Sequence, residues 1–490
     1  MDGMSAPQQT AATGGKTFFG HPRMLANLFS VELWERFSFY GMQALLLYYM
    51  TYSLAEGGLG LDAGVAAGLV GAYGGGVYLS TILGAWLADR VLGSERVLFF
   101  SAIIIMSGHI ALALLPGAVG LAIGLVLVGV GSGGLKANAS SLVGTLYAPG
   151  DDRRDAGFSI FYMGINIGAL VGPLLTNLAW DAYGFHVGFG LAAIGMAAGL
   201  VQYAAARKNL PPTAHDVENP LPRSAYRHWI LIAAAAVVLI AVVVATGLLD
   251  AGNLANVMAY TAIAATIAYF AVILTSRRVT AVERRRVYSF MPLFVASAAF
   301  WSLFQQQFTV VALYSESRLD RNLFGWEMPP GMVQSINPVF IIVFAGIFAA
   351  VWTRLGSRQP SSPVKFALGL MVMGLAFLAF IPFAGGGPNT TPLLGLAGIL
   401  LLFTWAELFI SPIGLSVTTK LAPEAFRTQM LALFFLSISL GTTVSGLLAG
   451  FYSEETEVPY FAFSGITALI LGGALLAAAP VIRRSMSGVR

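Results

Sequence analysis

The 490-residue chain contains no cysteine, and only 10% of its residues are charged. The lack of cysteine excludes a disulfide framework, thiol catalysis and cysteine-ligated metal sites. A soluble domain carries about 25% charged residues, so this composition leaves no room for a large soluble domain. The five histidines are scattered and form no metal cluster or nucleophile–base set, so we expect neither an enzyme nor a cofactor. The net charge of +4 is dispersed over short loops, so we expect no nucleic-acid partner.

Long apolar runs dominate the rest of the chain, which is 57% hydrophobic. A helix crosses the bilayer core with about 20 apolar residues. Residues 1–20 lack the features of a cleavable signal peptide, so we expect the first helix to act as the insertion signal. The runs predict an all-α polytopic membrane protein with fourteen transmembrane helices, near residues 24–53, 64–91, 96–115, 118–147, 155–183, 187–207, 228–248, 254–275, 287–315, 332–353, 364–383, 391–420, 427–451 and 459–482.

The basic residues indicate the orientation of these helices. Arg36 and Lys136 lie within predicted helices, and Arg318 and Arg321 lie in one connection expected to be external. Every other Lys and Arg falls in the termini, in the alternate connections on the side of the termini, or at the helix ends that adjoin those connections. Cytoplasmic loops carry such an excess of positive charge. We therefore expect a multi-pass protein of the plasma membrane with both termini in the cytoplasm.

The helices divide into six, two and six. An even number of inserted helices leaves both sets of six in the same orientation, as in transporters with a central site between two parallel halves. The inserted pair has no acid or base at membrane depth, and we expect it to be lipid-facing and accessory. The predicted domains are an N-terminal six-helix bundle (24–207), a linker with two accessory transmembrane helices (208–286) and a C-terminal six-helix bundle (287–482).

One loop motif occurs twice. Residues 84–96 read GAWLADRVLGSER, and residues 346–358 carry a degraded copy between the equivalent helices of the second half. The first copy resembles the loop signature of the major facilitator superfamily. That resemblance implies a fold of two six-helix bundles in which Asp89 caps a neighbouring helix end. Asp89 and Arg90 would then belong to a conformational latch, and an ordinary helix terminus is the simpler alternative.

Further motifs narrow the family. Residues 32–41 read ELWERFSFYG, residues 158–168 read FSIFYMGINIG, residues 135–140 read LKANAS and residues 407–416 read ELFISPIGLS. In this order, and over nearly the whole chain, they resemble the signatures of the proton-dependent oligopeptide transporters, whose bacterial members have two extra central helices. The resemblance implies a proton-coupled symporter of the bacterial inner membrane that imports di- and tripeptides by alternating access. It also implies protons as the coupling ion, contact with membrane lipid and function as a monomer.

A short peptide presents an ammonium group, a carboxylate and amides, so its site needs partners of both signs, adaptable hydrogen-bonding groups and aromatic walls. Lys136 and Glu407 supply one buried charge of each sign, and we expect both to gate as well as bind. The resemblance implies that Asn166, Asn337 and Glu407 hold the amino end and that Lys136 engages the carboxylate. The other predicted substrate-binding residues are Tyr40, Gln43, Tyr78, Trp301, Gln305, Phe434 and Ser437.

Four positions depart from the family pattern. Phe39 replaces a tyrosine, and Phe434 stands where a tryptophan is frequent. Gln43 and Gln305 stand where many members carry an arginine and an acid that form a gating ion pair. Losing one partner would strand a buried charge, whereas losing both leaves two amides able to hydrogen-bond. We therefore expect Gln43 and Gln305 to approach each other as a gate when the external side is closed.

The remaining ionisable cluster lies in the first helix. Glu32, Glu35 and Arg36 share neighbouring faces of one helix, and each charge at bilayer depth costs at least ~2.5–3.5 kcal/mol. Arg36 favours an ionised carboxylate beside it, while the second carboxylate favours a neutral one. We therefore expect this cluster to carry the coupling proton, with Glu407 as the second proton site.

Other interpretations remain open at this level. The predicted site residues have structural alternatives, namely a permanent Lys136–Glu407 salt bridge, interhelical hydrogen bonds for Asn166 and Asn337, and packing for Tyr78 and Trp301. The acidic cluster could merely stabilise its helix. The same fold could also carry another small zwitterion, an anion or a drug with protons, which Phe39 and Gln43 keep in consideration.

Overall fold

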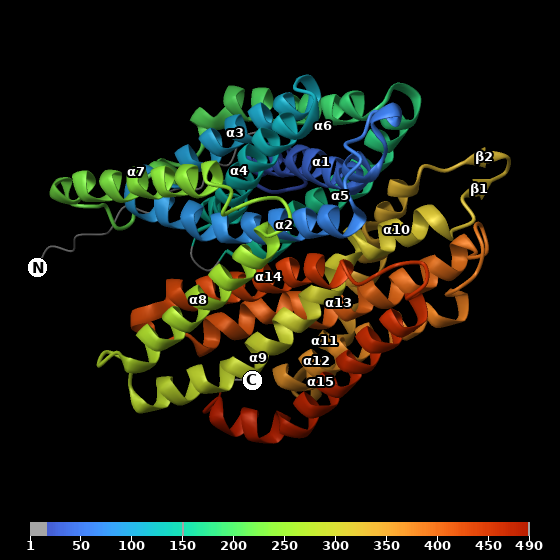
Figure 1. Ribbon diagram of the computed structural model, residues 1–490. Coiled ribbons are helices and arrows are strands. Elements are labelled where there is room, and N and C mark those ends of the chain that lie inside the picture. Colours follow the sequence, from blue (N-terminus) through green and yellow to red (C-terminus); the bar gives the residue numbers. More distant parts are fainter. Residues whose placement is uncertain (1–16, 149–150, 489–490) are drawn as a thin grey trace, which may run out of the picture.

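The computed structural model describes residues 17–148 and 151–488, and they form a bundle of long helices (Figure 1). Thirteen segments are long and apolar enough to cross a membrane, and α1, which carries the charged cluster, is the fourteenth long span. The predicted all-α membrane fold with fourteen spans is confirmed. The helices are α1 (Met24–Thr51), α2 (Ala63–Leu87), α3 (Ser94–Leu114), α4 (Gly117–Thr145), α5 (Arg154–Tyr183), α6 (Phe185–Ala206), α7 (Arg223–Ala245), α8 (Leu254–Thr275), α9 (Ala281–Phe304), α10 (Val310–Ser317), α11 (Ile336–Leu355), α12 (Ser362–Leu378), α13 (Leu393–Leu421), α14 (Arg427–Ala449) and α15 (Glu457–Ser485).

Two halves are visible in Figure 1, the blue-to-green α1–α6 above and the yellow-to-red α9–α15 below. In the first half α1 packs on α5 and α6, and α3 packs on α4. In the second half α12 packs on α13 and α15, and α9 packs on α14. Gly168 permits a close approach of α5 to α1, because a Cβ there would collide with Leu33 and Arg36 of α1. This contact fixes α5 directly beside the charged cluster.

The halves meet on one side of the protein, which we call the closed side, where α1 ends and α2 begins. The opposite side, where α1 begins and α15 ends, is called the terminal side. At the α2–α14 seam a Cβ on Gly71 would lie 2.7 Å from the Cα of Gly446, so the two backbones touch. Among the described residues, the side chains that hydrogen-bond across the halves are Tyr48 to the Ala312 carbonyl (3.0 Å), Ser335 to the Leu170 carbonyl (2.9 Å) and Ser439 to the Gly75 carbonyl (2.8 Å).

The ninth span differs from its prediction at both ends. It begins at Ala281, ahead of the predicted residue 287, because Thr280 and Glu283 form a capping box around a polar first turn that an apolar window cannot detect. It is also interrupted by the 3₁₀ segment η5 (Gln305–Phe308) before α10. A short hairpin of β1 (Asn322–Leu323) and β2 (Trp326–Glu327) follows, and the 3₁₀ segment η6 (Pro330–Ser335) leads into α11. These breaks shape the wall of the central cavity.

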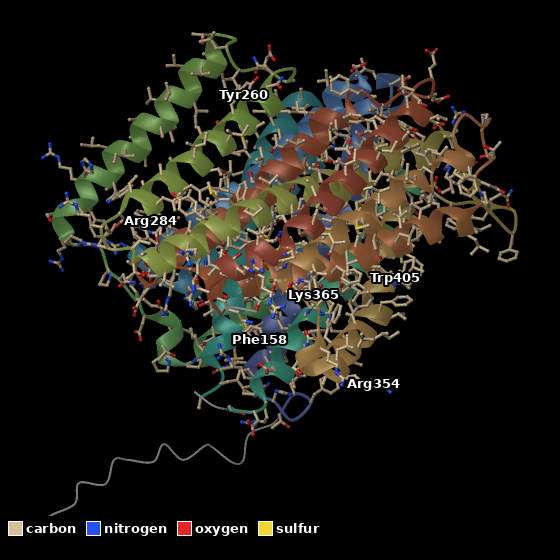
Figure 2. The ribbon with its side chains drawn as sticks, turned by 90° about the horizontal axis from the view of Figure 1, so that it is seen from below. Phe158, Tyr260, Arg284, Arg354, Lys365 and Trp405 are labelled. Atoms are coloured by element: carbon tan, nitrogen blue, oxygen red, sulfur yellow. The ribbon has the colours of Figure 1, made fainter. Side chains whose placement is uncertain are left out.

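The two inserted helices have different surroundings. All residues of α7 are at least partly exposed, and Figure 2 shows this helix standing out from the bundle. By contrast, α8 buries one face against α2, α9 and α14, and therefore contacts both halves. Its buried residues are Ala255, Ala259, Ala262, Thr266, Phe270 and Ile273. Thus α7 has the exposure expected of a lipid-facing span, whereas α8 covers the seam between the halves.

The loop motif after α2 folds against the linker and not against a helix end. The Asn219 amide donates a hydrogen bond of 2.8 Å to the Asp89 carboxylate, and the backbone N–H of Asn219 donates to the Asp89 carbonyl. The backbone N–H of Leu221 donates to the Arg90 carbonyl. In this conformation Asp89 is therefore not a helix cap, because the linker segment 216–222 lies within hydrogen-bonding distance and supplies the donors.

Candidate functional site

A cavity lies between the halves at the middle of the spans. Its walls come from α1, α2, α4 and α5 of the first half and from α9, η5, η6, α11 and α13 of the second. The hydrogen bonds at Tyr48 and Ser335 join the halves toward the closed side. The predicted site residues that line the cavity are Tyr40, Gln43, Tyr78, Lys136, Asn166, Trp301, Gln305, Asn337 and Glu407.

The first half supplies the cationic wall. The Lys136 ammonium lies 4.6 Å from the centroid of the Tyr78 ring and 5.4 Å from that of Phe39, so both rings attract it through their π faces. In the part of the chain that the structure describes, no carboxylate lies within salt-bridge distance of Lys136. The predicted pairing of Lys136 with Glu407 is therefore not formed in this conformation, and the ammonium is available to an anionic group in the cavity.

The second half supplies the acidic wall. The Asn337 amide donates a hydrogen bond of 3.0 Å to the Thr404 hydroxyl, which fixes its side chain. Among the described residues, the buried Oε2 of Glu407 and Nε1 of Trp301 have no hydrogen-bond partner. Buried polar atoms without partners are costly. Here the acceptor and the donor belong to residues that line one cavity. A ligand that donates to Glu407 and accepts from Trp301 would satisfy both.

Sequence reasoning missed several lining residues. Tyr162 lines the cavity, and its carbonyl accepts a hydrogen bond of 2.9 Å from the Asn166 amide. Gln307 and Gln334 also line it, and within the described chain the buried Oε1 of Gln334 has no partner. The signal that could have found these glutamines is their position in apolar stretches, where a carboxamide needs a polar neighbour.

Two predicted substrate-binding residues lie outside the cavity lining. Phe434 is buried and its ring lies 5.8 Å from that of Phe435, centroid to centroid. The Ser437 hydroxyl is hydrogen-bonded to Ser297 of α9 at 2.8 Å and donates to the carbonyl of Phe434. Neither residue lines the cavity in this conformation, because this face of α14 packs on its own half, and their contact with substrate stays a prediction.

Gln43 and Gln305 both line the cavity, as expected from their pairing. However, no hydrogen bond joins their amides within the described residues. The closed side is already sealed by contacts elsewhere, at Gly71 and Ser335. A direct amide pair is therefore not what closes that side in this conformation, although a shared ligand could still connect the two side chains.

The charged cluster of α1 lies beside the cavity and is fully buried. Nε of Arg36 is 2.8 Å from Oε1 of Glu32 and 2.9 Å from Oε2 of Glu35, and the Ser132 hydroxyl donates to Glu35 at 3.0 Å. Cζ of Arg36 lies 5.8 Å from the centroid of the Phe39 ring, which Lys136 also contacts. Phe39 thus joins the cluster to the cavity. In their ionised forms the two carboxylates and the two cations around this ring sum to zero charge.

A model of the POT family matches residues 95–467. An uncharacterized transporter of Bacillus subtilis is 43% identical over 477 residues, which is 97% of each chain. A di-/tripeptide transporter of Lactococcus lactis is 41% identical, with 97% of this chain and 98% of that one covered. The crystal structure of a peptide transporter POT in complex with sulfate has a TM-score of 0.93 and 46% identity, covering 96% of this chain and 97% of that one. The chain therefore belongs to the POT family of proton-dependent oligopeptide transporters, and is a multi-pass membrane transporter and not an enzyme.

Proposed function

We propose that the chain is a proton-coupled symporter that imports di- and tripeptides across the inner membrane of a bacterium. The single observation that carries this proposal is one cavity with Lys136 on the first half and Glu407 on the second. A dipeptide fits that arrangement because its carboxylate and ammonium groups pair with opposite walls. Nothing in this scheme requires a cofactor, and we propose that the protein works as a monomer surrounded by lipid.

The amides between the two charges suit a peptide better than a simple amino acid. Asn166, Asn337 and Gln334 offer donors and acceptors to the peptide bond and to the ammonium group. Tyr162 and Trp301 provide apolar surface with polar tips for variable side chains. The amino end of the peptide would bind near Glu407, whose Oε2 has no hydrogen-bond partner among the described residues. The carboxylate of the peptide would bind near Lys136.

Proton coupling follows from the charge count around Phe39. Glu32 and Glu35 are balanced by Arg36 and Lys136 while Lys136 has no anionic ligand. When a peptide carboxylate pairs with Lys136, the site gains one negative charge, which favours protonation of a carboxylate in the cluster. Binding of peptide and proton is then mutually reinforcing, as reciprocal linkage requires. Glu407 pairs with the peptide ammonium group while peptide is bound, and it serves as the second proton site when that pairing is absent.

The direction of transport depends on the proton gradient and on which side of the protein faces the cytoplasm. We propose that the terminal side is cytoplasmic, because the chain's basic residues gather in its termini and the connections on that side. In this conformation the closed side, which would be external, is sealed at the α2–α14 seam and at η6. Import would then require the α2–α14 contact to open so that the cavity faces outward.

A carrier of the same fold for another small zwitterion is the second candidate. Phe39 removes a hydroxyl from the site, and Gln43 removes a cation that would have strengthened binding of a carboxylate. A cavity with one fewer cationic side chain would suit a ligand that forms fewer ionic contacts with the protein. The two candidates differ in whether the distance between the ligand's charged ends must match a peptide.

The test uses proteoliposomes and exchange of labelled Ala-Ala without a gradient, competed by unlabelled ligands. Ala-Ala and Ala-Ala-Ala should compete, whereas N-acetyl-Ala-Ala and Ala-Ala-amide should each compete at least about tenfold more weakly, because each loses one charged contact. Glu407→Gln should remove the preference for a free amino end, and Lys136→Gln the preference for a free carboxylate. Equal competition by the blocked peptides, or no competition by any peptide, would contradict the proposal.

A further inference from the structure

A second hollow lies on the terminal side of the second half, away from the central cavity. It is formed by the connection between α11 and α12 and by the ends of α13 and α15. Three cations line it, namely Lys365, Lys420 and Arg483, together with serine hydroxyls that include those of Ser361 and Ser416. Its lining, all of it within the described chain, contains no aspartate or glutamate. The hollow is therefore strongly positive and rich in hydrogen-bond donors.

Lys365 distinguishes this hollow from an ordinary basic loop. Only 8% of Lys365 is exposed, and its ammonium contacts Oε1 of Gln359 at 2.9 Å and the Trp352 ring at 4.2 Å. Neither partner carries a negative charge. In the described part of the chain, the salt bridges include none to Lys365, Lys420 or Arg483. A buried ammonium without a counter-ion is costly, and two further cations beside it raise that cost.

The equivalent place in the first half is neutralised internally. There the third helix, α3, begins with Glu95, which is buried and lies 2.6 Å from Arg207 and 3.3 Å from His215. The third helix of the second half is α12, whose first turn carries Lys365 and no acid. The degraded copy of the loop motif has thus lost its anion while the basic residues remain.

We infer that this hollow binds a phosphate-type anion, either the headgroup of an anionic phospholipid or free phosphate. The three cations and the serine hydroxyls match the charge and the acceptor oxygens of a phosphate group. The start of α12 adds the positive end of a helix dipole. Basic pockets at helix ends on one face of a membrane protein suit lipid headgroups in particular. A bound anion would tie the ends of α12, α13 and α15 together.

Thermal unfolding of the full-length protein in neutral detergent tests this inference. Phosphatidylglycerol should raise the unfolding midpoint more than phosphatidylcholine does. The double variant Lys420→Gln/Arg483→Gln should need at least about tenfold more of the anionic lipid for the same rise, because two charge-assisted contacts are lost. Both residues are exposed, so the substitutions leave the core intact. Arg484→Gln is the matched control, since Arg484 is adjacent and exposed but does not line the hollow.

The same unfolding measurement with inorganic phosphate in place of chloride, at equal ionic strength, distinguishes free phosphate from a lipid headgroup as the bound anion. A phosphate-specific rise that the double variant loses supports a free anion, and a rise with the lipid alone supports a headgroup. Lys365→Met should be stable without any anion and should lose the response, because the buried charge that needs compensation is gone. The inference is overturned if no anion exceeds its neutral control, or if both variants respond as the unmodified protein does.

Discussion

The seam between α2 and α14 offers a direct perturbation of the proposed transport cycle. A Cβ on Gly71 would lie 2.7 Å from the Cα of Gly446 and 3.0 Å from the Thr442 carbonyl oxygen. Ordinary contacts of a Cβ begin at 3.4 Å, so Gly71→Ala forces the two helices apart by about 0.7 Å. Overpacking of this kind costs roughly 1–3 kcal/mol. Because the cost applies only while the seam is closed, the balance should shift roughly 5- to 150-fold toward the state open on that side.

Gly68→Ala is the matched control for Gly71→Ala. Both glycines lie on α2 and both substitutions gain the same helix propensity, but a Cβ on Gly68 would lie 3.7 Å from the Cβ of Ala255, an ordinary contact. Gly68→Ala should therefore leave the equilibrium unchanged. This comparison separates the effect of the seam from any general effect of alanine on the helix.

Spin labels can measure the shift, because the chain has no native cysteine. Leu54→Cys and Phe451→Cys place labels at exposed positions on the closed side of each half, 79% and 76% exposed. Gly71→Ala should enrich the longer distances between these labels, and Gly68→Ala should not. Identical distance distributions in the two variants would refute the reasoning that this seam is the gate.

The remaining predictions concern the charged and amide groups. Glu32→Gln and Glu35→Gln should keep peptide counterflow, which needs no gradient, while losing accumulation driven by a pH gradient; if both still accumulate peptide, the proton site lies elsewhere and Glu407 is the first alternative. Gln305→Glu should impair transport, because the new buried charge lacks a cation, and adding Gln43→Arg should restore it. If the change in uptake in the double variant equals the sum of the changes in the two single variants, the two positions are not coupled.

The spans were predictable because a bilayer demands about 20 apolar residues, a requirement that is visible in any sequence. The break at Gln305–Phe308 was not predictable, because its three glutamines are good helix formers and include no glycine or proline to mark a break. The segment η6 was not distinguished from the helix that it precedes. Those breaks depend on how α9 and α11 pack against the other half. Local composition does not contain that information.

The site was predictable where a polar residue is unusual for its surroundings. Lys136 and Glu407 are charges in apolar helices, and both line the cavity. Phe434 and Ser437 do not line the cavity in this conformation. The sequence does not show this, because α14 carries buried Ser and Thr residues at many positions and they do not single out the face that meets the cavity. Gln334 was missed for a related reason, since its segment carries no helical pattern to orient it.

The most direct test of proton-coupled peptide import is the movement of protons caused by peptide. The protein is reconstituted into liposomes that contain a pH-sensitive dye, with equal pH on both sides and a membrane potential negative inside. Addition of Ala-Ala should acidify the interior, because each peptide that enters brings protons bound at the Glu32–Glu35–Arg36 cluster, and N-acetyl-Ala-amide should not. Entry of labelled Ala-Ala without any change in internal pH would contradict the account.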